Sequence, residues 1–108
     1  MADPVEGQLV AYNARDVETF LPWFADDVVV EDGDGNLVLR GIEAMRARYG
    51  PMFAANPALV CTIVSRIRVG AQWVIDEESI TGRSPTAEHV VAIYKVENER
   101  ITKVRFYR

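Results

Sequence analysis

A chain of 108 residues has room for one hydrophobic core, and we expect a single domain over residues 1–108. Its 16 acidic residues outnumber its 12 basic ones, the formal net charge is −4, and no basic cluster stands out, which argues against nucleic-acid binding. No apolar run approaches the roughly 20 residues that a membrane helix needs, and the first residues lack the charge and apolar core of a signal peptide, so we expect a cytoplasmic protein without membrane contacts.

Three helices are predicted in the first half of the chain. Apolar side chains at helical spacing predict a helix over residues 5–14. Asp16 is a suitable N-cap for a second, short helix, which Pro22 is expected to shorten or bend. A third helix is predicted from Ile42, and the prolines at positions 51 and 57 indicate its end.

The remaining segments have the composition of strands. The β-branched run Val28–Glu31 predicts a strand, and Asp32–Asn36 has the residues of a turn. Short connections separate four later segments, so neighbouring strands should be antiparallel. These segments cover residues 59–69, 72–81, 88–96 and 100–107. Helices first and a strand meander afterwards predict the α+β class, with helices on one face of a curved sheet.

The order of these segments resembles that of a known superfamily. The runs Asn13–Asp16, Phe24–Val28 and Glu31–Gly33 lead from helices into a strand that ends on a carboxylate, and Gly41–Tyr49 follows as a helix. Together they resemble the opening of the SnoaL-like, nuclear transport factor 2-like superfamily, in its ketosteroid isomerase-like branch. The resemblance implies a cone-shaped α+β domain, with three N-terminal helices on a mainly antiparallel sheet and a pocket for a small hydrophobic molecule.

Partners and cofactors follow from the resemblance and from the composition. The families that the sequence resembles usually dimerise through the sheet, and Trp73, Tyr94 and Tyr107 are candidate interface aromatics, so we expect a homodimer. The single cysteine, Cys61, fits a reducing compartment. One cysteine and one histidine are too few for a usual zinc site, and we expect no metal and no cofactor.

Asp32 is the leading candidate for a catalytic base. A carboxylate at the end of an apolar strand, beneath an aromatic-rich helical layer, would be partly desolvated, which raises its pKa toward the range useful for acid–base chemistry. In the ketosteroid isomerases that the sequence resembles, the matching position carries the base that moves the substrate proton. The glycines on either side of Asp34 leave a second interpretation open, in which Asp32 is a solvated turn residue.

The hydrogen-bond donors of the resembled isomerases are not matched. Those enzymes hold the developing enolate with a tyrosine and a protonated aspartic acid. Here the tyrosine's place is taken by Gln8, and the acid's place falls at Ala92 or, with a one-residue register change, at Val91; neither can donate a proton. A missing donor costs roughly 3–4 kcal/mol in the transition state, so a true ketosteroid isomerase is not expected. Tyr12 and Tyr49 could replace the donor, or could be core aromatics.

Two further groups of residues are candidates for catalysis. Arg66 with Glu77 and Glu78 resembles part of the aspartate–arginine–aspartate site of limonene epoxide hydrolases. Alternatively, these residues form a cross-strand ion pair on the outer face, which would stabilise the fold by well under about 1 kcal/mol if exposed. His89, the only histidine, has a titration range suited to proton transfer. It begins a strand after a loop, where the polyketide cyclases of the resembled superfamily place acid–base residues.

An apolar set could line the pocket or could fill a core, and its members would be hydrophobic in either case. The candidate substrate-binding residues are Leu9, Trp23, Val30, Met45, Phe53, Val64, Val90, Ala92, Val104 and Phe106. We therefore expect a small hydrophobic-ligand pocket protein, with Asp32 as the base of a cofactor-independent isomerase, cyclase or hydratase and Tyr12, Tyr49 or His89 as donor. The alternatives are a non-catalytic binding or dimerisation domain and an epoxide hydrolase-like enzyme that uses Arg66.

Overall fold

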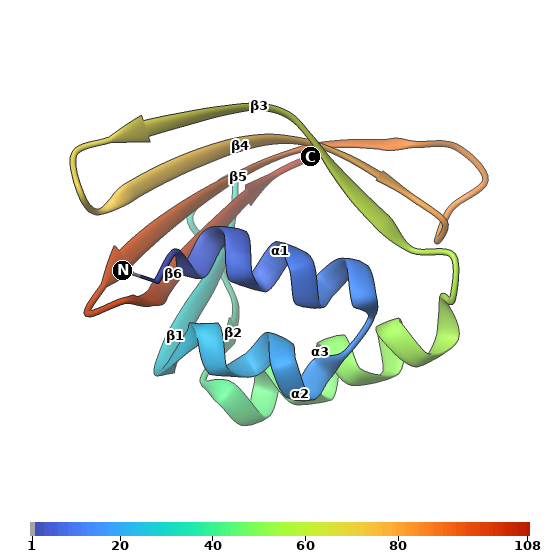
Figure 1. The fold of residues 1–108 in the computed structure, drawn as a ribbon, viewed down its shortest axis with the longest axis horizontal. Coiled ribbons are helices and arrows are strands. Elements are labelled where there is room, and N and C mark those ends of the chain that lie inside the picture. Colours follow the sequence, from blue (N-terminus) through green and yellow to red (C-terminus); the bar gives the residue numbers. More distant parts are fainter. Residues whose placement is uncertain (1) are drawn as a thin grey trace.

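The helices lie together on one face of a single curved sheet (Figure 1). The computed structural model describes residues 2–108. The helical elements are α1 (Pro4–Ala14), α2 (Val17–Phe20), a 3₁₀ turn (Leu21–Trp23) and α3 (Ile42–Ala55). The strands are β1 (Phe24–Asp32), β2 (Leu37–Arg40), β3 (Val60–Val69), β4 (Trp73–Thr81), β5 (Glu88–Glu97) and β6 (Arg100–Tyr107). This is the α+β class and the helix-on-sheet arrangement that the sequence predicts.

Capping residues set the boundaries of the helices. The Asp3 side chain accepts a hydrogen bond from an amide in the first turn of α1, and Asp16 caps α2 as predicted. Pro22 lies in the 3₁₀ turn, where it ends the regular helix. The prediction that Pro51 marks the end of α3 is wrong: this proline lies inside the helix, which continues because Phe53 beyond it packs into the core.

The sheet combines a meander with one parallel pair. Its strand order is β2-β1-β6-β5-β4-β3, and β3 to β6 form the predicted antiparallel meander. Strand β1 pairs with β6 in parallel. Strand β2 is an additional edge strand that the sequence pattern did not predict; it pairs with β1 after the turn at Asp32–Asn36. The parallel pair places β1 between the edge strand β2 and β6.

A β-bulge in β3 changes which side chains face the helices. Ile63 pairs with Glu78 and Ser65 pairs with Glu77, so Val64 between them has no partner on β4. An extra residue of this kind interrupts the two-residue alternation of a strand. Val64 is therefore 59% exposed, and Arg66 beyond the bulge faces the helices.

An aromatic cluster forms the core between the helices and the sheet. Phe20 is almost fully buried, and its ring lies 4.8 Å from that of Phe24 and 4.9 Å from that of Tyr49, measured between centroids. Phe53 packs edge-on against Tyr12, with 5.3 Å between ring centroids. Burying an aromatic side chain of this size contributes roughly 1.5–3 kcal/mol, so this cluster fixes the position of the helices over the sheet.

The other face of the sheet has no helix over it (Figure 1). Ile67, Val69, Trp73 and Tyr107 are exposed there, and we call these four residues the outer apolar patch. Tyr94 does not belong to it: this tyrosine is buried on the helix-facing side, which corrects its prediction as an interface aromatic. Within residues 2–108, no helix is both long enough and apolar enough to cross a membrane.

Candidate functional site

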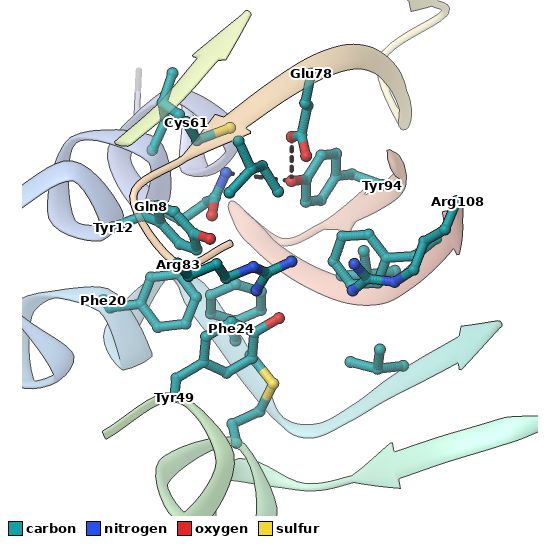
Figure 2. A pocket seen from close by; sticks show the side chains of 16 residues that line it. Gln8, Tyr12, Phe20, Phe24, Tyr49, Cys61, Glu78, Arg83, Tyr94 and Arg108 are labelled. Carbon is teal, nitrogen blue, oxygen red and sulfur yellow. Dashed lines mark hydrogen bonds between the residues drawn. The ribbon is translucent and has the colours of Figure 1, made fainter. Parts of the chain in front are cut away.

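A small cavity lies between the helices and the concave face of the sheet (Figure 2). Its volume is about 40 Å³, enough for a few water molecules. A second hollow of about 170 Å³ adjoins it and shares four of its lining side chains, Val30, Tyr49, Phe106 and Arg108. Most of the wall of the first cavity is apolar, formed by side chains such as Phe20, Phe24, Met45, Ile80 and Val104.

Glu78 is the carboxylate of this cavity. On β4 the side chains of Val74, Asp76, Glu78 and Ile80 alternate toward the helices and are all buried. Glu78 is 3% exposed. Its Oε2 accepts a hydrogen bond of 3.3 Å from the Tyr94 hydroxyl, a contact drawn in Figure 2. The strand therefore presents a carboxyl group to an apolar space with one hydroxyl beside it.

The pKa of Glu78 is raised to about 7. The main cause is burial, because an apolar surrounding disfavours the charged form, and the negative charge of Asp76 adds to the effect. The hydrogen bond from Tyr94 and the positive charge of Arg66 act in the opposite direction and are weaker. At neutral pH the carboxyl group is accordingly close to half ionised, which allows it both to accept and to return a proton.

A buried ion pair lies behind Glu78. Asp76 is fully buried, and both of its carboxylate oxygens accept hydrogen bonds from Arg66, at 2.6 and 2.9 Å. Arg66 also donates to Glu6 of α1, at 2.6 Å. Since Arg66 uses three of its nitrogens in these contacts and does not line the cavity, it connects the sheet to α1. A bidentate pair of this kind fixes geometry as well as charge.

The predicted grouping of Arg66 with Glu77 and Glu78 is therefore wrong, and so is the alternative of an ion pair on the outer face, because Arg66 pairs with the buried Asp76. Adjacent residues of a strand point to opposite faces, so Glu77 faces outward while Glu78 faces the cavity. On the outer face, Glu77 Oε2 lies 2.7 Å from His89 Nε2, and the imidazole is exposed. The structure thus places His89 away from the cavity. In residues 2–108, no three His, Cys, Asp and Glu side chains gather as a metal site requires.

Two tyrosine hydroxyls face the cavity from the helices. Tyr12 of α1 and Tyr49 of α3 both line it, and Figure 2 shows their rings directed into the same space as Glu78. Burial raises the pKa of both phenols, so they stay protonated and can donate hydrogen bonds. The described residues offer no hydrogen-bond acceptor to either hydroxyl. Both predicted donors therefore lie where a ligand in the cavity would meet them.

Gln8 and Cys61 complete the polar lining near Glu78. The Gln8 amide nitrogen donates to the Val5 carbonyl at 3.0 Å and lies 3.4 Å from the Tyr94 hydroxyl. The Gln8 amide therefore donates its hydrogen bonds to groups of the protein and not into the cavity. Burial raises the pKa of the Cys61 thiol to about 12, so the sulfur stays protonated and is not a nucleophile at neutral pH.

The structure corrects the prediction that Asp32 is desolvated. Asp32 accepts hydrogen bonds from the Asp34 amide at 3.0 Å, the Asn36 amide at 2.9 Å and the Asn36 side chain at 3.3 Å. These contacts hold its pKa below the usual value, because hydrogen bonds to the ionised form favour that form. Asp32 lines the second hollow and not the cavity of Glu78. Asp32 is therefore a turn residue, which was the second interpretation of the sequence.

Half of the predicted substrate-binding residues line the cavity; these are Leu9, Val30, Met45, Val104 and Phe106. The other five lie outside its wall. Val64 points outward at the bulge, Trp23 packs against Gly7 of α1, and Phe53, Val90 and Ala92 are buried in the surrounding core. Alternation along a strand predicts the face of a residue but not whether another side chain covers it.

Two arginines that the sequence did not mark as candidates also line the cavity. Arg83, in the loop between β4 and β5, donates to Glu88 through Nε and Nη2 at 2.6 and 3.1 Å. Its Nη1 lies 3.1 Å from the Met52 sulfur. Arg108 follows β6 and has its guanidinium over the Phe106 ring, 5.5 Å from the centroid. No motif marks these arginines in the sequence, because loop geometry brings them together.

Comparison with known proteins identifies the fold. The profile of the SnoaL-like domain matches residues 5–104. An uncharacterized cystatin-fold protein from Novosphingobium aromaticivorans is 29% identical, with a TM-score of 0.88 over 100% of this chain and 99% of that chain. A putative polyketide cyclase from Sinorhizobium meliloti is 20% identical, with a TM-score of 0.82 over 98% and 94%.

A third similar structure has a bound small molecule. It is a hypothetical protein with a ketosteroid isomerase-like fold from Catenulispora acidiphila, in complex with trimethylamine; it is 21% identical, with a TM-score of 0.77 over 97% of this chain and 84% of that chain. No curated protein matches this chain. The matches agree with the cone-shaped arrangement of helices on a curved sheet.

Proposed function

Since this chain belongs to the SnoaL-like domain family, we propose that its cavity binds a small, largely apolar carbonyl compound on which Glu78 transfers a proton without a cofactor. The observation that carries the proposal is the carboxyl group of Glu78, buried in an apolar cavity with its pKa raised to about 7. A titratable group perturbed in this way within a cavity is the usual property of a proton-transfer residue. The family includes polyketide cyclases and ketosteroid isomerases, so the proposed chemistry lies within its range.

The geometry supports a specific division of roles. The ionised form of Glu78 takes a proton from a carbon next to the carbonyl, and the electron pair of that C–H bond moves onto the carbonyl oxygen as an enolate. The hydroxyl of Tyr12 or Tyr49 donates a hydrogen bond to this oxygen. Glu78 then returns the proton to the same carbon or to another one, which gives exchange or isomerisation. In a substrate with a second carbonyl, the enolate carbon attacks that carbonyl carbon, the C=O π bond breaks to leave an alkoxide, and Glu78 returns the proton to the alkoxide, which gives cyclisation.

The surroundings favour this step. Phenolic donors already in place around an apolar cavity stabilise a developing negative charge more strongly than water would, because they need not reorient. Tyr94 holds the Glu78 carboxyl through its hydroxyl at 3.3 Å and acts as a positioning residue. The proposal therefore assigns the base to Glu78 in place of Asp32, while it retains Tyr12 and Tyr49 as donors.

Deuterium exchange tests the proposal without knowledge of the natural substrate. Cyclohexanone and 1-indanone are incubated in D₂O with the protein, and loss of the α-proton signals is followed by NMR. We expect exchange above the buffer rate, with a rate that rises with pH and levels above about pH 7. Glu78→Gln should abolish it. Glu77→Gln, a matched change one residue away on the outer face, should leave it unchanged.

Two outcomes would contradict this assignment. Equal exchange in the native protein and in Glu78→Gln would show that Glu78 is not the base. Loss of exchange in Asp32→Asn with retention in Glu78→Gln would return the role to Asp32. Binding of the ketones without any exchange would favour the second candidate, a non-catalytic binding domain, which Gln8 in place of the isomerase tyrosine also favours.

We also propose that the outer apolar patch mediates a homodimer. Ile67, Val69, Trp73 and Tyr107 form an apolar surface on the face of the sheet without helices, and exposed patches of this kind mark interfaces. Charged side chains flank the patch, including Lys95, which lies over the Trp73 ring at 5.6 Å. A two-fold arrangement would bring the same patch of two chains together.

A further inference from the structure

The charges around the cavity differ from those of the whole chain. The protein has a net charge of −4, yet two of the three charged side chains that line the cavity are Arg83 and Arg108. The third is Glu78, which burial keeps partly protonated at neutral pH. The adjoining hollow shares Arg108 and adds Arg48, but Glu31 and Asp32 also line it, so its own charges balance. The positive excess therefore lies in the first cavity, at Arg83 and Arg108.

The two guanidinium groups converge on one carboxylate oxygen. Arg83 Nη2 lies 3.1 Å and Arg108 Nη1 lies 3.9 Å from Glu88 Oε1. This arrangement shows that the two arginines can share a single carboxylate. Glu88 supplies one negative charge against two positive ones, and the longer distance leaves Arg108 without a hydrogen bond to it.

Part of the donor capacity of Arg83 has no strong acceptor among the described residues. A guanidinium carries five N–H donors, and Arg83 uses Nε and Nη2 for Glu88. Its Nη1 has only the Met52 sulfur as a partner among the described residues, and thioether sulfur is a weak acceptor. Figure 2 shows the Arg83 guanidinium in the middle of the lining, near Tyr49.

We propose that Arg83 and Arg108 bind the carboxylate of a small apolar acid whose ring occupies the hollow beside them. The anion would take the place of Glu88 between the two guanidiniums or share them with it. The size of the space fits this ligand: a dry cavity of about 150 Å³ holds a benzene ring, and the adjoining hollow has about 170 Å³. This inference rests on the proposed function, since it defines the substrate class of the same cavity.

The substrate class has a chemical consequence for the proposed reaction. An acid bound by its carboxylate at Arg83 and Arg108, with its ring in the adjoining hollow, would leave the middle of the molecule at the cavity of Glu78 and the tyrosine hydroxyls. A substrate with a carbonyl group between ring and carboxylate, a keto acid, would place its acidic C–H bond near the base. The arginines then determine orientation, because they fix which part of the molecule reaches Glu78.

A matched pair of probes tests this proposal. The probes are 3-phenylpropanoate and 3-phenylpropanamide, which have nearly the same shape and differ in charge. Their dissociation constants are measured at pH 7.5 by following amide signals of the ¹⁵N-labelled protein in NMR titrations. A charge-assisted hydrogen bond contributes about 1.5–3 kcal/mol, so we expect the acid to bind at least tenfold more tightly than the amide.

Three variants locate the effect. Arg83→Met and Arg108→Met should each reduce binding of the acid by about tenfold while leaving binding of the amide unchanged. Glu88→Gln should strengthen binding of the acid, because it removes the internal competitor. Arg100→Met removes one exposed positive charge at the first residue of β6 and should change neither constant.

The outcomes separate this proposal from the proposed function. Equal binding of acid and amide, or a preference that survives both arginine variants, would overturn the anion site while leaving a cavity that binds apolar molecules. Failure of both probes to bind would overturn the anion site and count against a ligand cavity as well. A preference for the acid that disappears in Arg83→Met and grows in Glu88→Gln would establish the site.

Discussion

Replacement of Glu78 by glutamine should change how the stability of the protein depends on pH. In the folded protein the pKa of Glu78 is raised from 4.5 to about 7, whereas the unfolded chain exposes the carboxyl group to water. Between these two values the folded protein keeps a proton that the unfolded chain releases. The stabilisation is therefore complete below pH 4.5 and is lost as the pH rises through about 7.

The size of the effect follows from the two pKa values. A pKa difference of one unit between the folded and unfolded states corresponds to about 1.4 kcal/mol. The ionisation of Glu78 alone should therefore lower the free energy of unfolding by roughly 3 kcal/mol as the pH rises. Glu78 is 3% exposed, so solvent screening does not reduce this figure much. The glutamine variant has no proton to lose, and its side chain can still accept the hydrogen bond from Tyr94.

The measurement is urea-induced unfolding of the native protein and of Glu78→Gln at intervals from pH 4.5 to 8. Because other titrating groups are common to both proteins, the difference between their unfolding free energies isolates Glu78. As the pH rises, we expect the native protein to lose roughly 3 kcal/mol of unfolding free energy relative to Glu78→Gln. Glu43→Gln, which alters an 85% exposed carboxylate, should give a constant difference. A constant difference for Glu78→Gln as well would refute the account of its burial.

The buried ion pair and the outer face give three further predictions. Asp76→Asn removes the nearest negative charge and should lower the pKa of Glu78, shifting the pH midpoint of ketone exchange to lower pH; an unchanged midpoint would remove Asp76 as a cause. Arg66→Met leaves Asp76 buried without a partner and should destabilise the protein by about 3–5 kcal/mol in urea unfolding, whereas a loss below about 1 kcal/mol would contradict its burial. Ile67→Glu should convert a dimer to a monomer in analytical ultracentrifugation, with Val10→Glu, at an exposed position of α1, as the matched control that keeps the dimer; a dimer that survives Ile67→Glu would exclude the patch.

The order of the helices and strands could be predicted because it depends on local signals. The cap at Asp16 and the apolar spacing of α1 act within a few residues, and the structure confirms the cap and the helix, although Val10 of the apolar set is exposed. Strand β2 was missed because its four residues, Leu37–Arg40, carry too short a pattern to distinguish a strand from a turn. The parallel pairing of β1 with β6 joins segments about 75 residues apart, and no local signal records it.

The candidate site was harder to predict because it depends on which face of the sheet each side chain occupies and on which side chains the helices bury. The period of two along β4 separates Glu77 from Glu78, so the sequence did contain the signal that these neighbours cannot share a site. It did not contain the choice of face, since Ile75 on one side is as apolar as Val74 on the other. The pKa of Asp32 depends on the hydrogen bonds of the Asp32–Asn36 turn, which lower it where burial would raise it.

The most direct test of the central claim is a ¹³C NMR titration of the Glu78 side-chain carboxyl, with Glu78→Gln to assign its signal. The Asp32 carboxyl serves as an internal comparison, with a pKa held below the usual value. The account predicts a midpoint for Glu78 at about 7. A midpoint near 4.5 would show a solvated carboxylate and would contradict both the desolvated cavity and the proton transfer proposed for it.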